Sequence, residues 1–309
     1  MEASMIARAV AAATAIVSEL DLTVDDVTVL HNSNKLALRL LPCNVFTRVA
    51  LAGQEVAELE VELALRFAAT GSPVAALDPR VEPRVYSRDG FAITLWTFYE
   101  SPTPPDLAPA DFAIAMERLH VDMKTFEAET PHFTDRVSEA HELVSSRDLT
   151  PALDDADRKL LIDTLDSLVS AIEHRRAPEQ LLHGEPHPGN VLSTHDGLRF
   201  IDLETCCRGP VEFDLAHVPA HVSERYPGVD QDLLDDCRGL VLAMVAAWRW
   251  DPTDEFPDGK RAAYQLVRVL RHGPPWPTLD AAMHRDFLVE GGGKRDPTNK
   301  RSRRESGSG

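Results

Sequence analysis

A short stretch near the middle of the chain carries the side chains best suited to chemistry. It reads HGEPHPGN at 183–190, and IDLE follows at 201–204. Phosphoryl transfer needs a carboxylate beside the acceptor hydroxyl and oxygen ligands for the metal ion on the nucleotide phosphates. Glu185 can supply the carboxylate, and Asn190 and Asp202 can supply the oxygen ligands. The types and spacing of these residues therefore predict a phosphotransferase site.

The residues between these motifs predict how the motifs are brought together. Proline and glycine prevent a helix through 183–190. Two short strands, at 191–193 and 198–201, are joined by an Asp-Gly step that is typical of a hairpin turn. This hairpin would return Asp202 to the neighbourhood of Asn190, so that two oxygen ligands converge on one hard cation. The alternative is an ordinary proline-rich loop and hairpin with incidental polar residues. This alternative is disfavoured because the histidine, the carboxylate, the asparagine, the hairpin and the IDLE motif all occur together in order.

The same segment resembles a known family. HGE at 183–185, Asn190, IDLE and then DLA at 214–216 follow the order of the aminoglycoside phosphotransferase family. The resemblance is specific over 181–220 and diffuse over the rest of roughly 25–290. It implies an α+β, protein-kinase-like bilobal fold with a small β-rich N-terminal lobe and a larger, mostly helical C-terminal lobe.

The resemblance implies a magnesium-dependent enzyme that moves the γ-phosphoryl group of ATP or GTP to a hydroxyl of a small molecule, aminoglycoside-like or another metabolite. Asn190 and Asp202 are the implied Mg²⁺ ligands, and Glu185 and His183 are the implied catalytic residues. Family members carry Asp at the position of Glu185, and a misplacement of about 1 Å can cost about 100-fold in rate. The alternative is therefore a non-catalytic, pseudokinase-like protein that binds nucleotide.

Further residues are implied to support this machinery. His183 and Asp214 would brace the catalytic loop, and Glu204 would lie behind the site or face the substrate. Arg48, in the strand FTRVAL, would hold the α- and β-phosphates, and Glu60 in the next helix would position it. An ion pair without any ligand is the alternative for Arg48.

The hydrophobic pattern predicts the elements of the N-terminal lobe, which is expected to bind nucleotide and to span 1–100. Strands are predicted at 27–30, 36–41, 45–51 and 91–99, and a helix at 54–69. The last strand leads into the hinge between the lobes. In the turn between the first two predicted strands, Ser33 and Asn34 could donate hydrogen bonds to the phosphates, although a plain hairpin turn is an equal interpretation.

The C-terminal lobe, predicted at 101–290, is expected to be catalytic and to bind the acceptor. It opens with a proline-rich linker, and helices are predicted at 111–126, 156–175, 232–250 and 259–271. Acids between 230 and 255 could face a cationic acceptor, although a solvated acidic surface is the simpler interpretation. The basic, glycine- and serine-rich tail at 291–309 is expected to be disordered.

Composition narrows the class of protein. The chain has 309 residues and a net charge of −18, which argues against nucleic acid as a partner because binding to its backbone depends on Lys and Arg. The four cysteines lack metal-binding spacing, so we expect reduced thiols and a cytoplasmic protein. No stretch is long and apolar enough for a membrane partner, and 9–17 is interpreted as part of an amphipathic helix, not a signal peptide.

Overall fold

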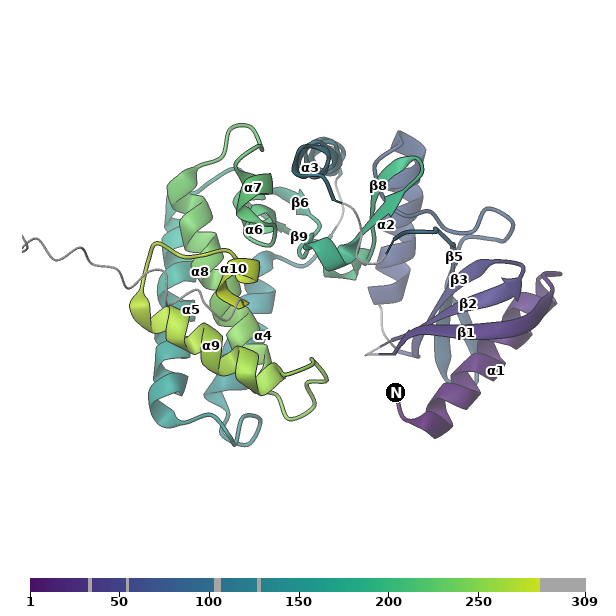
Figure 1. Ribbon diagram of the computed structural model, residues 1–309, viewed down its shortest axis with the longest axis horizontal. Helices are drawn as coiled ribbons and strands as arrows, with labels where there is room; N and C mark the ends of the chain where they lie inside the picture. The colour runs from purple at the N-terminus through teal and green to yellow at the C-terminus, as the bar shows by residue number, and fades with distance from the viewer. Residues whose placement is uncertain (33–34, 54–55, 103–106, 127–128, 284–309) are drawn as a thin grey trace, which may run out of the picture.

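The structure of this chain is a computed structural model that describes residues 1–32, 35–53, 56–102, 107–126 and 129–283. The predictions for Ser33, Asn34 and the tail at 291–309 lie outside the described residues. The described part has an α+β architecture with two lobes, one built on an antiparallel sheet and the other on a group of helices (Figure 1). The predicted bilobal fold is therefore confirmed. The boundary placed at residue 100 stays a prediction.

The smaller lobe consists of one helix and a five-stranded sheet. Its elements are α1 (Ala3–Glu19), β1 (Val24–Asn32), β2 (Leu36–Pro42), β3 (Val45–Leu51), β4 (Tyr86–Arg88) and β5 (Phe91–Thr97). The strands are antiparallel and lie in the order β1-β2-β3-β5-β4. The predicted strands and opening helix are present, with bounds that differ by a few residues.

Alternation along β2 and β3 separates a core face from a cleft face. The core face packs with α1 through apolar side chains from both strands, namely Leu36, Leu38, Leu40, Val45 and Val49. Because successive side chains of a strand point to opposite faces of the sheet, Arg39 of β2 and Arg48 of β3 face the cleft instead. The pattern of the strand thus determines that Arg48 is available to a ligand.

Helix α2 (Val56–Thr70) connects the sheet to the second lobe. Leu63 and Phe67 belong to the same hydrophobic cluster as Phe112 of α3 (Pro109–Lys124). Glu60 lies three and seven residues before them and therefore shares their buried helical stripe. The helix consequently carries a buried carboxylate to the edge of the cleft.

The larger lobe is mostly helical. Besides α3 it contains α4 (Phe133–Ser145), α5 (Asp155–Arg175), α6 (Val211–Leu215), α7 (Ala220–Ser223), α8 (Gln231–Trp248), α9 (Gly259–His272) and α10 (Leu279–Met283). Helix α8 is buried on most of its surface and packs against α4, α5 and α9 (Figure 1). The four predicted helices correspond to α3, α5, α8 and α9, whereas α4 was not separately predicted.

Two short antiparallel pairs carry the motifs that are predicted to be catalytic. They are β6 (Gln180–Leu182) with β9 (Cys207–Gly209), and β7 (Val191–Thr194) with β8 (Gly197–Phe200). The second pair is the predicted hairpin. Its Phe200 exchanges backbone hydrogen bonds of 2.7 and 2.8 Å with Pro73 and Ala75, which attaches the hairpin to the segment after α2. The catalytic segment is thus connected to both lobes.

The cysteines and the helices bear on the predictions made from composition. All four cysteines are free thiols, and Cys206, Cys207 and Cys237 are buried. Burial raises the pKa of the Cys206 and Cys207 thiols, which makes them poor nucleophiles. Among the described residues, no helix combines the length and the apolar character needed to cross a membrane.

Candidate active site

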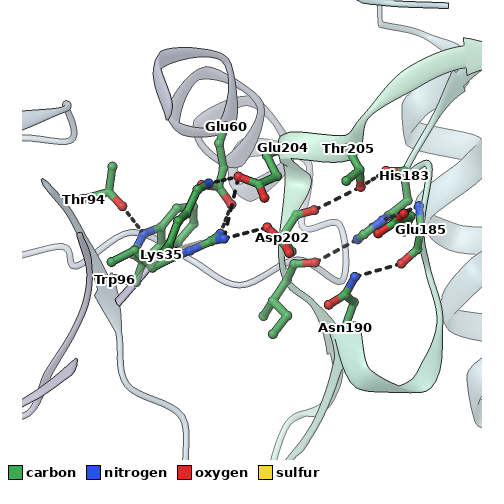
Figure 2. Close-up of polar contacts among 12 residues, drawn as sticks. Lys35, Glu60, Thr94, Trp96, His183, Glu185, Asn190, Asp202, Glu204 and Thr205 are labelled. Atoms are coloured by element: carbon green, nitrogen blue, oxygen red, sulfur yellow. Dashed lines mark hydrogen bonds and ion pairs between the residues drawn. The ribbon is translucent and has the colours of Figure 1, made fainter. Parts of the chain in front are cut away.

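The candidate site is a cleft of about 850 Å³ between the lobes. Strands β2 and β3 line one side of it, and the segment 96–102, which is the end of β5 and the residues that follow it, lines the back. The opposite side is formed by 188–192 and 200–203 of the catalytic hairpin. Figure 2 shows two groups of polar side chains here, one on each side of Asp202.

The first group is an ion-pair cluster formed by Lys35, Arg48, Glu60, Asp202 and Glu204. Arg48 connects the lobes, because its Nη1 contacts the Glu60 carboxylate on α2 and its Nη2 lies 2.7 Å from Asp202 Oδ1. The predicted ion pair of Arg48 with Glu60 is present.

Electrostatics within the cluster keep Arg48 and Asp202 charged. Burial lowers the pKa of Arg48, but the negative charges of Glu60 and Asp202 outweigh this and raise it. Burial likewise raises the pKa of Asp202, and the charge and hydrogen bond of Arg48 outweigh it and lower the value. A cation and an anion therefore face each other across the cleft.

Lys35 is a member of the cluster that sequence analysis missed. Its ammonium group contacts Glu204, which also lies 3.9 Å from Arg48 Nη2. Burial and the positive charge of Arg48 lower the pKa of Lys35. The signal that could have found it is the period of two along β2, because Lys35 precedes the cleft-facing residues Ala37 and Arg39 in the same alternation.

The second group is the catalytic loop, residues 183–190, which is held mainly through its backbone. The Asp214 carboxylate accepts backbone hydrogen bonds from His183, at 2.9 Å, and from Gly184, at 2.8 Å. Gly184 has φ +89° and a Cβ there would overlap the carbonyl oxygen of Thr205, so only glycine suits this position. The loop thus depends on a buried carboxylate and a close backbone approach.

His183 and His120 complete the support of the loop. His183 is fully buried, and burial lowers its pKa. Its Nε2 donates to the Ile201 carbonyl at 2.9 Å, and its Nδ1 accepts from the backbone N–H of Glu185 at 3.4 Å. His120 Nε2 lies 2.9 Å from Asp214. His183 and Asp214 therefore contact the backbone of the loop, and their role in bracing it stays a prediction. His120 is buried and contacts both Tyr226 and Asp214.

Asn190 and Asp202 lie on adjoining backbone at the end of the cleft. The backbone N–H of Ile201 donates to the Asn190 carbonyl at 3.0 Å, and both side chains line the cavity. Asn190 Nδ2 donates to the Glu185 carbonyl at 3.0 Å, so its amide oxygen is the atom it can offer to a cation. An amide oxygen and a carboxylate suit Mg²⁺, which is generally coordinated by one or two protein groups together with oxygens of the substrate phosphates. These residues fit the implied metal, and their role as ligands stays a prediction.

Glu185 is held by a partner that sequence analysis also missed. Its carboxylate contacts Arg136 of α4, and His217 lies close enough to act on it electrostatically. Burial raises the pKa of Glu185, but the charge and the hydrogen bond of Arg136 are the main causes that outweigh burial and lower the value, which favours the ionised form. Burial lowers the pKa of His217 to about 4. His217 directly follows the DLA motif, whereas nothing in the sequence marks Arg136.

The acids predicted between 230 and 255 mostly have local structural partners. Asp230 caps α8 by accepting backbone hydrogen bonds at 3.1 Å. Asp236 pairs with Arg175 at 2.8 Å and Asp254 with Arg249 at 2.7 Å. These contacts stabilise the larger lobe, and a role of the acids in binding a cationic acceptor stays a prediction.

The fold is similar to those of solved kinases. Amicoumacin kinase hAmiN, in complex with AMP-PNP, Ca²⁺ and Ami, aligns with a TM-score of 0.67 and 12% identity, over 90% of this chain and 96% of that chain. The GDP and kanamycin complex of APH(2")-IIia gives 0.61 and 17%, over 84% and 97%. A choline/ethanolamine kinase family protein from Mesorhizobium loti gives 0.59 and 15%, over 83% and 92%. At these identities the likeness concerns the fold.

Comparison with sequence families identifies the class of protein. A search of curated proteins found no significant match. The profile of the phosphotransferase enzyme family, in contrast, matches residues 44–265. This range includes the ion-pair cluster from Arg48 onward, the catalytic loop and the hairpin that carries Asp202. Because the match spans well over half of the chain, including residues 183–204 with the predicted catalytic motifs, the chain belongs to the phosphotransferase enzyme family.

Proposed function

We propose that this phosphotransferase moves the γ-phosphoryl group of ATP or GTP, with Mg²⁺, to a hydroxyl group of a small molecule. The observation that carries the proposal is the convergence of Arg48, Asn190 and Asp202 on one cleft, with Asn190 Nδ2 hydrogen-bonded to the backbone carbonyl of Glu185. A phosphate-binding cation, two oxygen donors for a metal and an ionised carboxylate are the groups that phosphoryl transfer requires.

The donor would bind along the ion-pair cluster. Arg48 and Lys35 offer a planar fork and an ammonium group to the phosphate oxygens. Asn190 and Asp202 would hold Mg²⁺, whose charge, when bound, neutralises charge on the phosphates. Related folds are solved with AMP-PNP, GDP or ADP, which supports a nucleotide donor without choosing the base.

The acceptor would bind beside Glu185. The hydroxyl oxygen of the acceptor forms a bond to the γ-phosphorus while the bond from that phosphorus to the β-phosphate oxygen breaks. The hydroxyl proton passes to the Glu185 carboxylate and then to solvent, and the products are a phosphorylated acceptor and a nucleoside diphosphate. Because the transition state is loose, the residues act mainly by orientation and electrostatics.

Proteins of similar fold are solved with kanamycin or spectinomycin, and others are choline kinases. That the acceptor of this chain is cationic stays a prediction. A cytoplasmic location also stays a prediction.

The test is a panel of acceptors incubated with the purified chain, ATP or GTP, and Mg²⁺. The panel contains aminoglycosides, macrolides, amino-alcohols and neutral or acidic hydroxyl compounds, and transfer is followed with γ-labelled nucleotide. We expect label in one class of acceptor, and Glu185→Gln to lose most transfer while nucleotide affinity stays the same.

A negative panel would be read together with nucleotide binding. If the wild type binds magnesium nucleotide but neither transfers its phosphoryl group to any acceptor nor hydrolyses it, the proposal is wrong and the non-catalytic function is supported. If Glu185→Gln turns over normally with a verified acceptor, the assignment of Glu185 is wrong while the phosphotransferase activity stands.

A further inference from the structure

The contact between Arg136 and Glu185 joins the proposed base to a helix outside the family motifs. Arg136 Nη2 contacts Glu185 Oε1 across 49 residues of sequence. The two side chains are 17% and 22% exposed, so water competes weakly for them. A charge-assisted hydrogen bond in such a place orients a carboxylate more firmly than a neutral one.

Arg136 is itself fixed by its surroundings. It lies in the first turn of α4, which begins with a reciprocal capping box between His132 and Asp135. The backbone N–H of Arg208 on β9 donates to the Pro131 carbonyl at 2.7 Å, which ties the start of α4 to the sheet beside the catalytic loop. These contacts hold the helix, and they leave the long side chain of Arg136 to be fixed separately.

Trp248 supplies this second constraint. The Arg136 guanidinium lies 5.0 Å from the centre of the Trp248 ring at the end of α8, which is within the range of a cation–π interaction. A side chain stacked on one side and paired with Glu185 on another has few rotamers left. The planar guanidinium is suited to this arrangement, because one face stacks while the edge donates hydrogen bonds.

Glu185 is therefore held at three points. Its backbone N–H donates to His183 Nδ1, its carbonyl accepts from Asn190, and Oε1 of its carboxylate contacts Arg136. Among the described residues no hydrogen bond is recorded to the other carboxylate oxygen, Oε2. That oxygen is the one that could meet an acceptor hydroxyl.

We propose that Arg136 is a positioning residue, which holds the Glu185 carboxylate for the acceptor hydroxyl and adapts the loop to Glu where the family carries Asp. The inference rests on the proposed function. Shortening Glu185 to Asp withdraws the carboxylate by about one C–C bond, or about 1.5 Å, and separates it from Arg136. The partner on α4 thus explains how a longer side chain can serve at this position.

The first test compares two purified Arg136 variants and one control variant with the wild type, using a verified acceptor. Arg136→Met removes the charge and keeps an apolar chain over Trp248, and Arg136→Lys keeps the charge. We expect Arg136→Met to lower kcat by about 10- to 100-fold with the donor KM within about 2-fold, and Arg136→Lys to recover part of the loss.

Arg249→Met is the matched control. Arg249 is 16% exposed, pairs with Asp254 at 2.7 Å and stacks over Phe256 at 4.4 Å, so it resembles Arg136 in burial and contacts without touching Glu185. We expect its kcat to stay within about 2-fold of the wild type. Equal losses of kcat in both Met variants would mean that Arg136 acts only through stability.

The second test is a double-mutant cycle with Glu185→Asp. In that background the shortened carboxylate no longer reaches Arg136, so Arg136→Met should lower kcat by less than about 3-fold. A loss as large as in the wild type would overturn the proposal, because it would show that Arg136 acts on something other than Glu185.

Thermal unfolding of every variant separates these effects from failure to fold. If Arg136→Met does not fold, Arg136→Gln and Arg136→Lys replace it in both tests. An active wild type whose folded Arg136 variants all turn over normally refutes the positioning role alone. A wild type without transfer or hydrolysis refutes the proposed function and the positioning role together.

Discussion

The ion-pair cluster and the catalytic loop line the same cleft but are held in different ways. In the cluster, two cations and three carboxylates from both lobes contact one another through side chains. In the loop, the buried Asp214 accepts hydrogen bonds from consecutive backbone N–H groups. Side-chain ion pairs can exchange partners when phosphates and a metal arrive, whereas the backbone bonds cannot be changed without reshaping the loop. We therefore expect the cluster to govern ligand binding and the loop to govern stability.

The largest expected effect is loss of turnover when Asp202, on the cluster side, is changed to Asn. The change removes a charged ligand for a hard cation, and we expect kcat to fall by at least about 100-fold with weaker binding of magnesium nucleotide. The unfolding free energy should change less than with a substitution of Asp214, because the Asp202 side chain is 28% exposed whereas Asp214 is fully buried. Near-normal turnover would remove Asp202 from the metal site.

Asp214→Asn should have the opposite profile. His183 and Gly184 donate to different oxygens of Asp214, so the amide nitrogen of the new side chain would face one of these backbone N–H groups and leave it without an acceptor. The charge paired with His120 would also be lost. We expect a loss of about 3 kcal/mol in urea unfolding, with Asp196→Asn on the exposed hairpin turn as the control. If the folded variant kept wild-type stability, the loop would not depend on this carboxylate.

A change in the pH dependence of stability should follow from His217, beside the loop. Burial lowers its pKa from 6.5 to about 4, so the unfolded chain binds a proton that the folded chain refuses as pH falls. The free energy of unfolding therefore decreases from pH 6.5 to pH 4, by about 3 kcal/mol from this group.

His217→Asn should remove that part of the slope, measured by urea unfolding at several pH values. His195→Asn is the matched control, since the His195 side chain is fully exposed on the hairpin turn. An unchanged slope in His217→Asn would mean that His217 titrates equally in both states.

The smallest effect concerns coupling within the cluster. Arg48→Ala should weaken nucleotide binding in the wild-type background. The same substitution should cost less affinity in a Glu60→Ala background, because Glu60 acts through Arg48. We expect a coupling free energy of about 0.5 to 3 kcal/mol in a double-mutant cycle of nucleotide affinity. Glu62→Ala is the control, since Glu62 pairs with Arg66 on the outer face of α2. Additive losses would show that Arg48 and Glu60 bind nucleotide independently.

The sequence by itself determined the features that follow from local rules. The family resemblance selected Arg48 and Glu60, and local periodicity agrees with that choice. The period of two along β2 and β3 places Arg48 on the cleft face, and the period of the following helix places Glu60 on its buried stripe. The Asp-Gly turn predicts the hairpin that returns Asp202 to Asn190. In each of these cases the spacing of neighbouring residues is enough, because the backbone geometry of a strand, helix or turn repeats.

Only the tertiary structure decided which side chains meet across the cleft. Arg48 and Asp202 are 154 residues apart, and Arg136 and Glu185 are 49 apart. Lys35 reaches Glu204, and Arg136 reaches Glu185, through the packing of separate lobes and helices. No local period encodes such a meeting, and a lone charged residue on a strand or helix is usually solvated. The partner of Glu185 therefore becomes visible only when α4 is folded against the catalytic loop and Trp248 of α8 packs on Arg136.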